Sequence, residues 1–384
     1  MSTPKNYSEL SIIEHKKYQW KVWIHSLVPL ETRDDLATYY SPWVAAPCLE
    51  IAADPEKAYD YTWKGRTIAV ISDGSAVLWL GNIGWLAWLP VMEWKAVLFK
   101  KFGNVDAVPI VLNTQDPDEI IKIVEAISPT FWWINLEDIK APNCFYIEEE
   151  LKKRLNIPVF HDDQHGTAIV VLAALINALK LVNKEKDQIK IVMSWAGAAA
   201  TAIANLLVAR WVKHIVLVDT KWAIYTDRAD GMTEFKEKLA TYNLNNEQWD
   251  IHNVIPWADV FLWLSQPNLI DRTDVQKMNS QPIIFAMANP NPEILPDEAK
   301  AGGAYIVATG RSDYPNQVNN VLVFPGLFKG ALKARIKQFT QHHFLTAAYA
   351  LAGAIAQPTP DAIIPSPLAE WIADVVAQAI IDNA

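Results

Sequence analysis

Apolar runs with strand character alternate with helical patterns along nearly the whole chain of 384 residues. Because parallel strands need crossover connections, this alternation predicts an α/β fold in which helices cover both faces of a parallel sheet. The expected strands are residues 68–72, 132–136, 158–160, 189–193, 214–218, 260–264, 282–286 and 305–308. Between them, helices are expected over 116–127, 167–181 and 198–209.

The alternation breaks at NIPVFHDDQHG, residues 156–166, where we expect a boundary between two domains. The first, over 1–160, is an N-terminal domain. The second, over 161–384, is a Rossmann-like domain, a doubly wound parallel sheet with additional helices at its C-terminal end. The helix that begins near Thr167 is apolar on nearly all sides, which predicts that it is buried between the domains.

The composition excludes several classes of protein. Hydrophobic residues make up 51% and charged residues 20%, which allows a sizeable core and excludes disorder. The formal net charge of −9 argues against nucleic acid and anionic membranes as partners. The N-terminus lacks the apolar segment of a signal peptide. Two cysteines without a CxxC pair, Cys48 and Cys144, fit a reducing cytoplasm.

Residues 189–219, IKIVMSWAGAAATAIANLLVARWVKHIVLVD, are typical of a dinucleotide-binding strand, turn, helix and strand. The positions of the fingerprint G-x-G-x-x-G/A hold Trp195, Gly197 and Ala200. Gly197 would admit a pyrophosphate to the helix N-terminus. Asp219 would bind the ribose 2′-hydroxyl and favour NAD over NADP, although Lys221 is nearby. The alternative is a purely structural βαβ unit. The expected cofactor contacts in the turn are Trp195, Ala196, Gly197, Ala198, Ala199 and Ala200.

Two pairs of adjacent acids follow predicted strands, Glu137–Asp138 in INLEDI and Asp162–Asp163 in VFHDDQHG. The carboxyl ends of parallel strands are where α/β folds bind ligands, and hard oxygen ligands suit Mg²⁺ or Mn²⁺. The alternative is a set of solvated loop acids. Lys95, in VMEWKAVLFKKFG, would act as a general base if burial and a nearby cation depress its pKa, the alternative being an exposed helical lysine.

Seven motifs occur in order at compatible spacing between residues 18 and 367. Together they resemble malic enzyme, specifically the short bacterial form. They are LVPLETRDDLATYYSPWVAAPCLEIAADPEKAYDYT, AVISDGSAVLWLGNIG, PVMEWKAVLFKKFGNVDA, INLEDI, PVFHDDQHGTAIV, FAMANPNPEI and ATGRSDYPNQVNNVLVFPG.

The resemblance implies oxidative decarboxylation of L-malate to pyruvate and CO₂, with NAD (NADP being possible) and Mg²⁺ or Mn²⁺. Members of this family are commonly dimeric, so a homodimer is expected, in the cytoplasm that the cysteine usage indicates. Lys95 matches the catalytic lysine, which takes the hydroxyl proton, and Asp162 matches an active-site acid beside it. Tyr40 matches the tyrosine that protonates the enol; from the residues alone it could equally be a buried structural tyrosine. The matched metal ligands are Glu137, Asp138 and Asp163, and the matched asparagines are Asn320, at the substrate, and Asn289, at substrate and cofactor.

Two other functions share these features. Malolactic enzyme has the same motifs and uses NAD, but forms lactate. A nucleotide-free pseudoenzyme with a scaffolding role is expected if the tryptophans of the nucleotide and catalytic motifs are literal.

Tryptophan is abundant where glycine is scarce. The chain has 17 tryptophans and 14 glycines, against about 27 glycines in an average chain of this length. Our hypothesis is that the source reads the UGA codon as glycine, as some bacterial lineages do, while the printed sequence writes tryptophan. The tryptophans at positions where the family typically carries glycine are Trp43, Trp79, Trp94, Trp132, Trp133, Trp195, Trp211 and Trp222.

Overall fold

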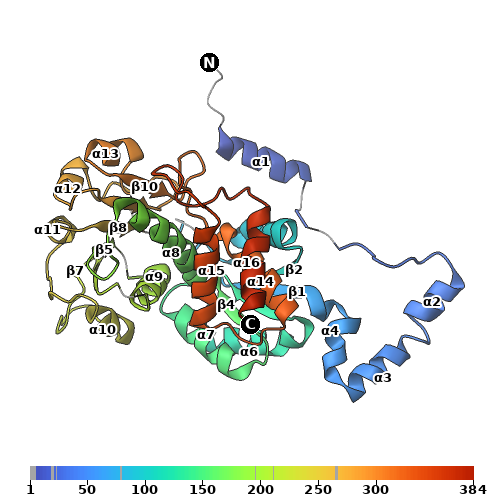
Figure 1. Cartoon of the computed structure of the whole chain (residues 1–384). Coiled ribbons are helices and arrows are strands. Elements are labelled where there is room, and N and C mark those ends of the chain that lie inside the picture. Colours follow the sequence, from blue (N-terminus) through green and yellow to red (C-terminus); the bar gives the residue numbers. More distant parts are fainter. Residues whose placement is uncertain are drawn as a thin grey trace.

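The computed structural model describes residues 6–18, 21–22, 24–77, 80–194, 196–210, 212–263 and 267–384. These residues form two mainly parallel sheets, an N-terminal arm and a group of C-terminal helices (Figure 1). The predicted α/β fold with a doubly wound second sheet is confirmed.

The first sheet contains β1 (Thr67–Ser72), β2 (Asp106–Val111), β3 (Trp133–Leu136) and β4 (Val159–His161). They are parallel, in the order β2-β1-β3-β4. The sequence patterns predicted three of them and missed β2, because Asp106 and Pro109 interrupt its apolar pattern. A proline is tolerated there because β2 lies at the edge of the sheet. The associated helices are α5 (Trp85–Leu98), α6 (Pro117–Ile127) and α7 (Asn143–Arg154).

The second sheet contains β5 (Lys190–Ser194), β6 (His214–Asp219), β7 (Trp222–Ala223), β8 (Val260–Trp263), β9 (Ile283–Ala286) and β10 (Ile306–Thr309). Their order is β10-β9-β8-β5-β6-β7, with only β7 antiparallel to its neighbour. Apart from that short strand, this is the order of a doubly wound dinucleotide-binding fold, whose ligand crevice opens between the strands corresponding to β5 and β8. The predicted end of β8, Leu264, lies outside the described residues. The connecting helices are α9 (Ala198–Val208), α10 (Glu234–Ala240), α11 (Ile251–Val254), α12 (Arg272–Gln276) and α13 (Pro296–Ala301).

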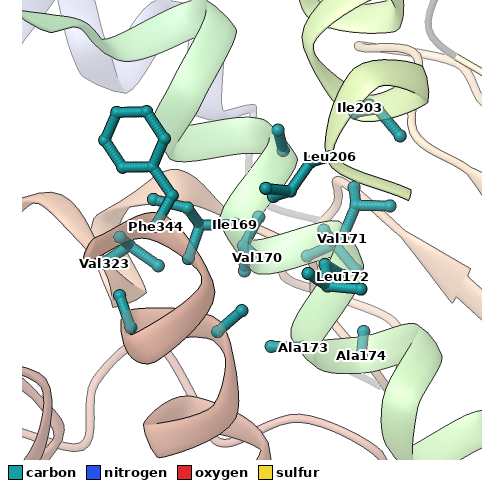
Figure 2. Close-up of a cluster of buried hydrophobic side chains, with 14 of the residues drawn as sticks. Ile169, Val170, Val171, Leu172, Ala173, Ala174, Ile203, Leu206, Val323 and Phe344 are labelled. Carbon is teal, nitrogen blue, oxygen red and sulfur yellow. The ribbon is translucent and has the colours of Figure 1, made fainter. Parts of the chain in front are cut away.

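One long helix, α8 (Asp162–Val182), connects the two sheets. Its length and hydropathy would suit a membrane span, but most of its side chains are buried in the protein, so it is a core helix. Figure 2 shows Ile169 and Val170 near Phe344, and Leu206 of α9 beside the same helix. The burial of this helix agrees with the sequence prediction.

The last part of the chain returns to the first sheet. It forms α14 (Phe324–Ala334), α15 (Gln341–Gly353) and α16 (Trp371–Asp382). α14 and α16 pack so closely that a Cβ at Gly326 would lie 2.5 Å from the Ala373 carbonyl oxygen, so glycine is what allows this approach. Phe328 of α14 packs against Trp133 of β3 in a tilted arrangement, with ring centroids 4.2 Å apart. The C-terminal helices therefore help to cover the first sheet.

The arm, residues 6–66, contains α1 (Tyr7–Tyr18), α2 (Arg33–Tyr39), α3 (Ala45–Ala53) and α4 (Ala58–Tyr61). None of these helices has a buried residue, and α2 and α3 stand away from both sheets (Figure 1). Several large apolar side chains on the arm are at least 70% exposed: Ile24, Leu27, Leu30 and Leu49. An exposed apolar surface of this kind is typical of an interaction site.

Two tryptophans have left-handed backbone conformations, Trp222 with a φ of 78° and Trp257 with a φ of 63°. Both are exposed. Positive φ is a genuine outlier for a bulky residue and is ordinary for glycine. Trp133, by contrast, is fully buried with its indole N–H unpartnered. Three tryptophans named by the glycine hypothesis lie outside the described residues: Trp79, Trp195 and Trp211.

Candidate active site

A buried lysine lies among the acids that follow β3 and β4. Lys95 on α5 is 7% exposed. Its Nζ is 2.8 Å from Glu137 Oε1 and 2.5 Å from Asp162 Oδ2. The same ammonium lies 4.4 Å from the centroid of the Phe324 ring, a cation–π contact. The alternative of an exposed helical lysine is excluded.

The strand register explains why the two acidic pairs meet. β3 and β4 are neighbours, and Leu136 pairs with His161, so the residues after each strand leave the sheet at the same edge. Asp138 adopts a φ of 49°, and its N–H donates to Asp163 Oδ2 at 2.7 Å. Asp162 and Asp163 occupy the first turn of α8, where the helix dipole favours negative charge.

Three carboxylates converge as the sequence predicts. Glu137, Asp138 and Asp163 each offer an oxygen within 4.8 Å of the others. Burial raises the pKa of Glu137 to about 8, against the pull of the Lys95 charge. Burial and the Asp163 charge raise the pKa of Asp138 well above its usual range. Hard oxygen donors that repel one another in this way fit a divalent cation. Cation binding itself stays a prediction.

The pKa of Lys95 is raised, not depressed as the sequence analysis expects. Burial lowers this pKa, but the charges of Asp162 and Glu137 outweigh burial and stabilise the ammonium. Loss of negative charge from those carboxylates would therefore lower the pKa of Lys95.

Asp162 is held in one orientation. Its Oδ2 accepts hydrogen bonds from Lys95 and from Asn320 Nδ2, the latter at 2.6 Å. Its Oδ1 is buried without a hydrogen-bond partner in the described structure. A Cβ at Gly166 would lie 2.1 Å from that oxygen, so only glycine leaves it room. A buried acceptor costs free energy until a ligand supplies a donor.

Sequence reasoning missed two neighbours of this cluster. Asn135 donates from Nδ2 to Glu137 Oε2 at 2.9 Å. It could have been found, because residues i and i+2 of a strand share a face. Phe324, which lies under the Lys95 ammonium, comes from a distant part of the chain and gives no local signal.

The nucleotide unit forms the predicted strand, helix and strand, which are β5, α9 and β6. Gly197 is the N-cap of α9 and provides no side-chain cap, so the first N–H groups of the helix are available to an anion. Ala200 is buried, as close packing of helix on strand requires. These features fit the pyrophosphate of a dinucleotide. Trp195 lies outside the described residues, and Asn289 is an exposed residue just beyond β9.

Tyr40 is not brought, within this chain, to the Lys95 cluster, which we define as Lys95, Glu137, Asp138, Asp162 and Asp163. It directly follows α2 and is 68% exposed, and α2 lies well away from β4 in Figure 1. The interpretation of Tyr40 as a buried structural residue is therefore wrong.

Comparison with known proteins agrees with this geometry. The family description "Malic enzyme, N-terminal domain" matches residues 19–152, and "Malic enzyme, NAD binding domain" matches residues 164–384. The chain is 51% identical over 369 residues to the bifunctional malic/malolactic enzyme of Bacillus subtilis, covering 95% of this chain and 90% of that protein. It is 49% identical to the NAD-dependent malic enzyme of Geobacillus stearothermophilus, covering 95% and 76%. The crystal structure of the NAD-dependent malic enzyme from Thermotoga maritima superposes with a TM-score of 0.94 at 43% identity, covering 97% and 98%.

Proposed function

The chain belongs to the malic enzyme family, whose reaction is the oxidative decarboxylation of malate, and we propose that the Lys95 cluster carries out this reaction. The observation that supports the proposal is the buried ammonium held between Glu137 and Asp162, next to three convergent carboxylates. We also place the protein in the cytoplasm, in line with its two unpaired cysteines.

Each side chain has a step to perform. Lys95 takes the proton of the malate hydroxyl as the carbon beside it is oxidised, and Asp162 fixes the Lys95 nitrogen through its own bond to Asn320. A bound nicotinamide dinucleotide supplies the hydride acceptor. Glu137, Asp138 and Asp163 would hold a divalent cation, which would supply Lewis-acid stabilisation of the substrate oxygens. After CO₂ leaves, Tyr40 protonates the enol carbon to give pyruvate.

We predict that Asp163→Asn removes the cation site. The substitution leaves two of three converging carboxylates and replaces a charged ligand with a weak neutral one. Calorimetric titration with Mn²⁺ should show a loss of affinity on the order of 100-fold. Asp187→Asn, which alters a surface ion pair with Lys213, is the matched control and should bind Mn²⁺ normally. Equal Mn²⁺ affinity in both variants would show that the three carboxylates hold no cation.

The exposed position of Tyr40 leads us to propose a homodimer in which each arm supplies the tyrosine of the other subunit's site. The arm carries the required residue away from its own cluster, and its exposed apolar side chains need a cover. A second copy of the chain satisfies both conditions, because a two-fold axis exchanges the arms reciprocally.

Mixing two inactive variants tests this arrangement. Co-expressed Lys95→Ala and Tyr40→Phe chains form heterodimers in which one site has both substitutions and the other has neither. We expect pyruvate formation to recover to about a quarter of the wild-type rate, given random pairing of subunits. Tyr40→Phe alone should impair protonation of the enol while leaving part of the hydride transfer. No recovery in the mixture would place Tyr40 and Lys95 of each site in the same subunit.

A second candidate reaction is the decarboxylation of malate to lactate. It is favoured by the similarity to a protein named as bifunctional malic/malolactic enzyme. In that reaction the reduced cofactor is consumed again, so CO₂ appears without a matching amount of reduced nicotinamide. Comparing the two products therefore separates the candidates.

A further inference from the structure

The carboxylate expected to bind the adenine ribose has no free acceptor position. Asp219 Oδ1 accepts from Arg228 Nη1 at 2.9 Å and from the Lys221 N–H at 2.8 Å. Asp219 Oδ2 accepts from Arg228 Nη2 and from Lys236 Nζ, both at 2.6 Å. A carboxylate offers about four lone-pair sites, so none remains for a ribose hydroxyl.

The two cations bound to Asp219 differ in freedom. The Arg228 side chain is only 4% exposed, and its Nη1 also donates to the carbonyl oxygens of Trp222 and Ala223, each at 3.2 Å. Arg228 therefore links β7 to the end of β6 by hydrogen bonds, and these bonds hold its side chain in one position. The Lys236 side chain is 23% exposed, and among the described residues its one further acceptor is the Gly231 carbonyl oxygen at 3.0 Å. Lys236 can therefore turn toward a ligand without breaking the hairpin.

A second lysine lies at the same place. The Lys221 side chain passes along Gly231, where an added Cβ would lie 3.2 Å from Lys221 Cδ and 3.8 Å from Lys221 Nζ. Arg228 already matches the charge of Asp219, so both lysines are surplus positive charge around Gly231. The remaining acids of the segment are exposed on the loop or on α10: Asp227, Asp230 and Glu234.

We propose that Lys221 and Lys236 bind the 2′-phosphate of NADP, and that Asp219 positions this site instead of binding ribose. The end of β6 is where such folds recognise the ribose 2′ substituent, and lysine is a common phosphate ligand. The inference rests on the proposed use of a nicotinamide dinucleotide. It reverses the preference for NAD that the position of Asp219 suggests in the sequence.

Binding of nucleotide fragments to the free protein tests the inference without turnover. All variants are produced in a host that decodes the gene as its source does. By calorimetry, 2′,5′-ADP should bind about tenfold more tightly than ADP, and the difference should shrink with added salt. Lys236→Ala should lower the 2′,5′-ADP affinity about tenfold and leave ADP binding equal or tighter, since Asp219 Oδ2 becomes free. Lys238→Ala, an exposed lysine on the same helix, should change neither.

The steady-state rates give a second measurement. The wild-type kcat/KM should be higher with NADP than with NAD, and Lys236→Ala should reverse that order through KM. Equal or weaker binding of 2′,5′-ADP than of ADP would overturn the inference, even if malate is oxidised with NAD. A protein that binds 2′,5′-ADP tightly but oxidises malate with neither cofactor would retain the lysine site and contradict the proposed function.

Discussion

Replacing Lys95 with alanine is expected to abolish the oxidation of malate. Its Nζ is the group placed between Glu137 and Asp162, and no other lysine in the described residues forms an ion pair with either carboxylate. A positioned general base contributes on the order of 10²–10⁴ in rate, and Lys95 also orients the acids around it. We therefore expect kcat for reduced nicotinamide to fall by about 10³-fold or more.

Loss of folding must be separated from loss of chemistry, because removing one partner of a buried ion pair costs about 3–5 kcal/mol of stability. Lys95→Arg keeps the positive charge but cannot release its proton, so it should be equally inactive and closer to the wild type in thermal unfolding. Lys100→Ala is the matched control. Lys100 follows Lys95 by about one and a half helical turns, and it is an exposed lysine that pairs with Asp106. It should keep full activity. An active, folded Lys95→Arg variant would show that another group is the base.

The fold was largely predictable because buried parallel strands are continuous apolar runs. Seven of the eight predicted strands agree with the structure within a residue or two at each end, and the eighth, β8, begins at the predicted residue. The exception, β2, lies at a sheet edge, where Asp106 and Pro109 are tolerated and the apolar signal is lost. The two-residue strand β7 is too short to have a pattern.

The candidate site was predictable where the sheet itself brings residues together. Glu137, Asp138, Asp162 and Asp163 meet because β3 and β4 are neighbouring parallel strands. The exposed position of Tyr40 on the arm was not predictable, since a motif places a residue in the chain and does not show where the fold carries it.

The occupation of Asp219 could not be read from the sequence either. Its fingerprint position predicts a ribose contact, but its acceptors are filled by Arg228 and Lys236, which follow at no fixed spacing. Only the folded β6–β7 hairpin shows that the Asp219 carboxylate accepts hydrogen bonds from both of these side chains.

Replacing tryptophan by glycine at two exposed turns is expected to stabilise the chain. Trp222 and Trp257 adopt φ values of 78° and 63°, at which a side chain with a Cβ is strained. In the chain translated with tryptophan at every such position, Trp222→Gly and Trp257→Gly should each raise the free energy of unfolding by about 1 kcal/mol, measured in denaturant. Trp371→Gly is the backbone control. That tryptophan begins α16, where glycine gives no such relief and lowers helix propensity. Destabilisation at all three positions would show that tryptophan suits the two turns.

The gene gives the decisive reading of the same hypothesis. Positive φ at two tryptophans and an unpartnered, fully buried indole at Trp133 are what a glycine backbone would produce if tryptophan were written onto it. Strain or overpacking costs about 1–3 kcal/mol at each such site, against a usual total stability of about 5–15 kcal/mol, so a literal chain would lose a large part of its stability. We therefore expect UGA at most tryptophan codons, and glycine at those positions in mass spectra of the natural protein. UGG codons throughout would make the tryptophans real, and the fingerprint would then lack its first glycine, which predicts a chain that does not bind the cofactor.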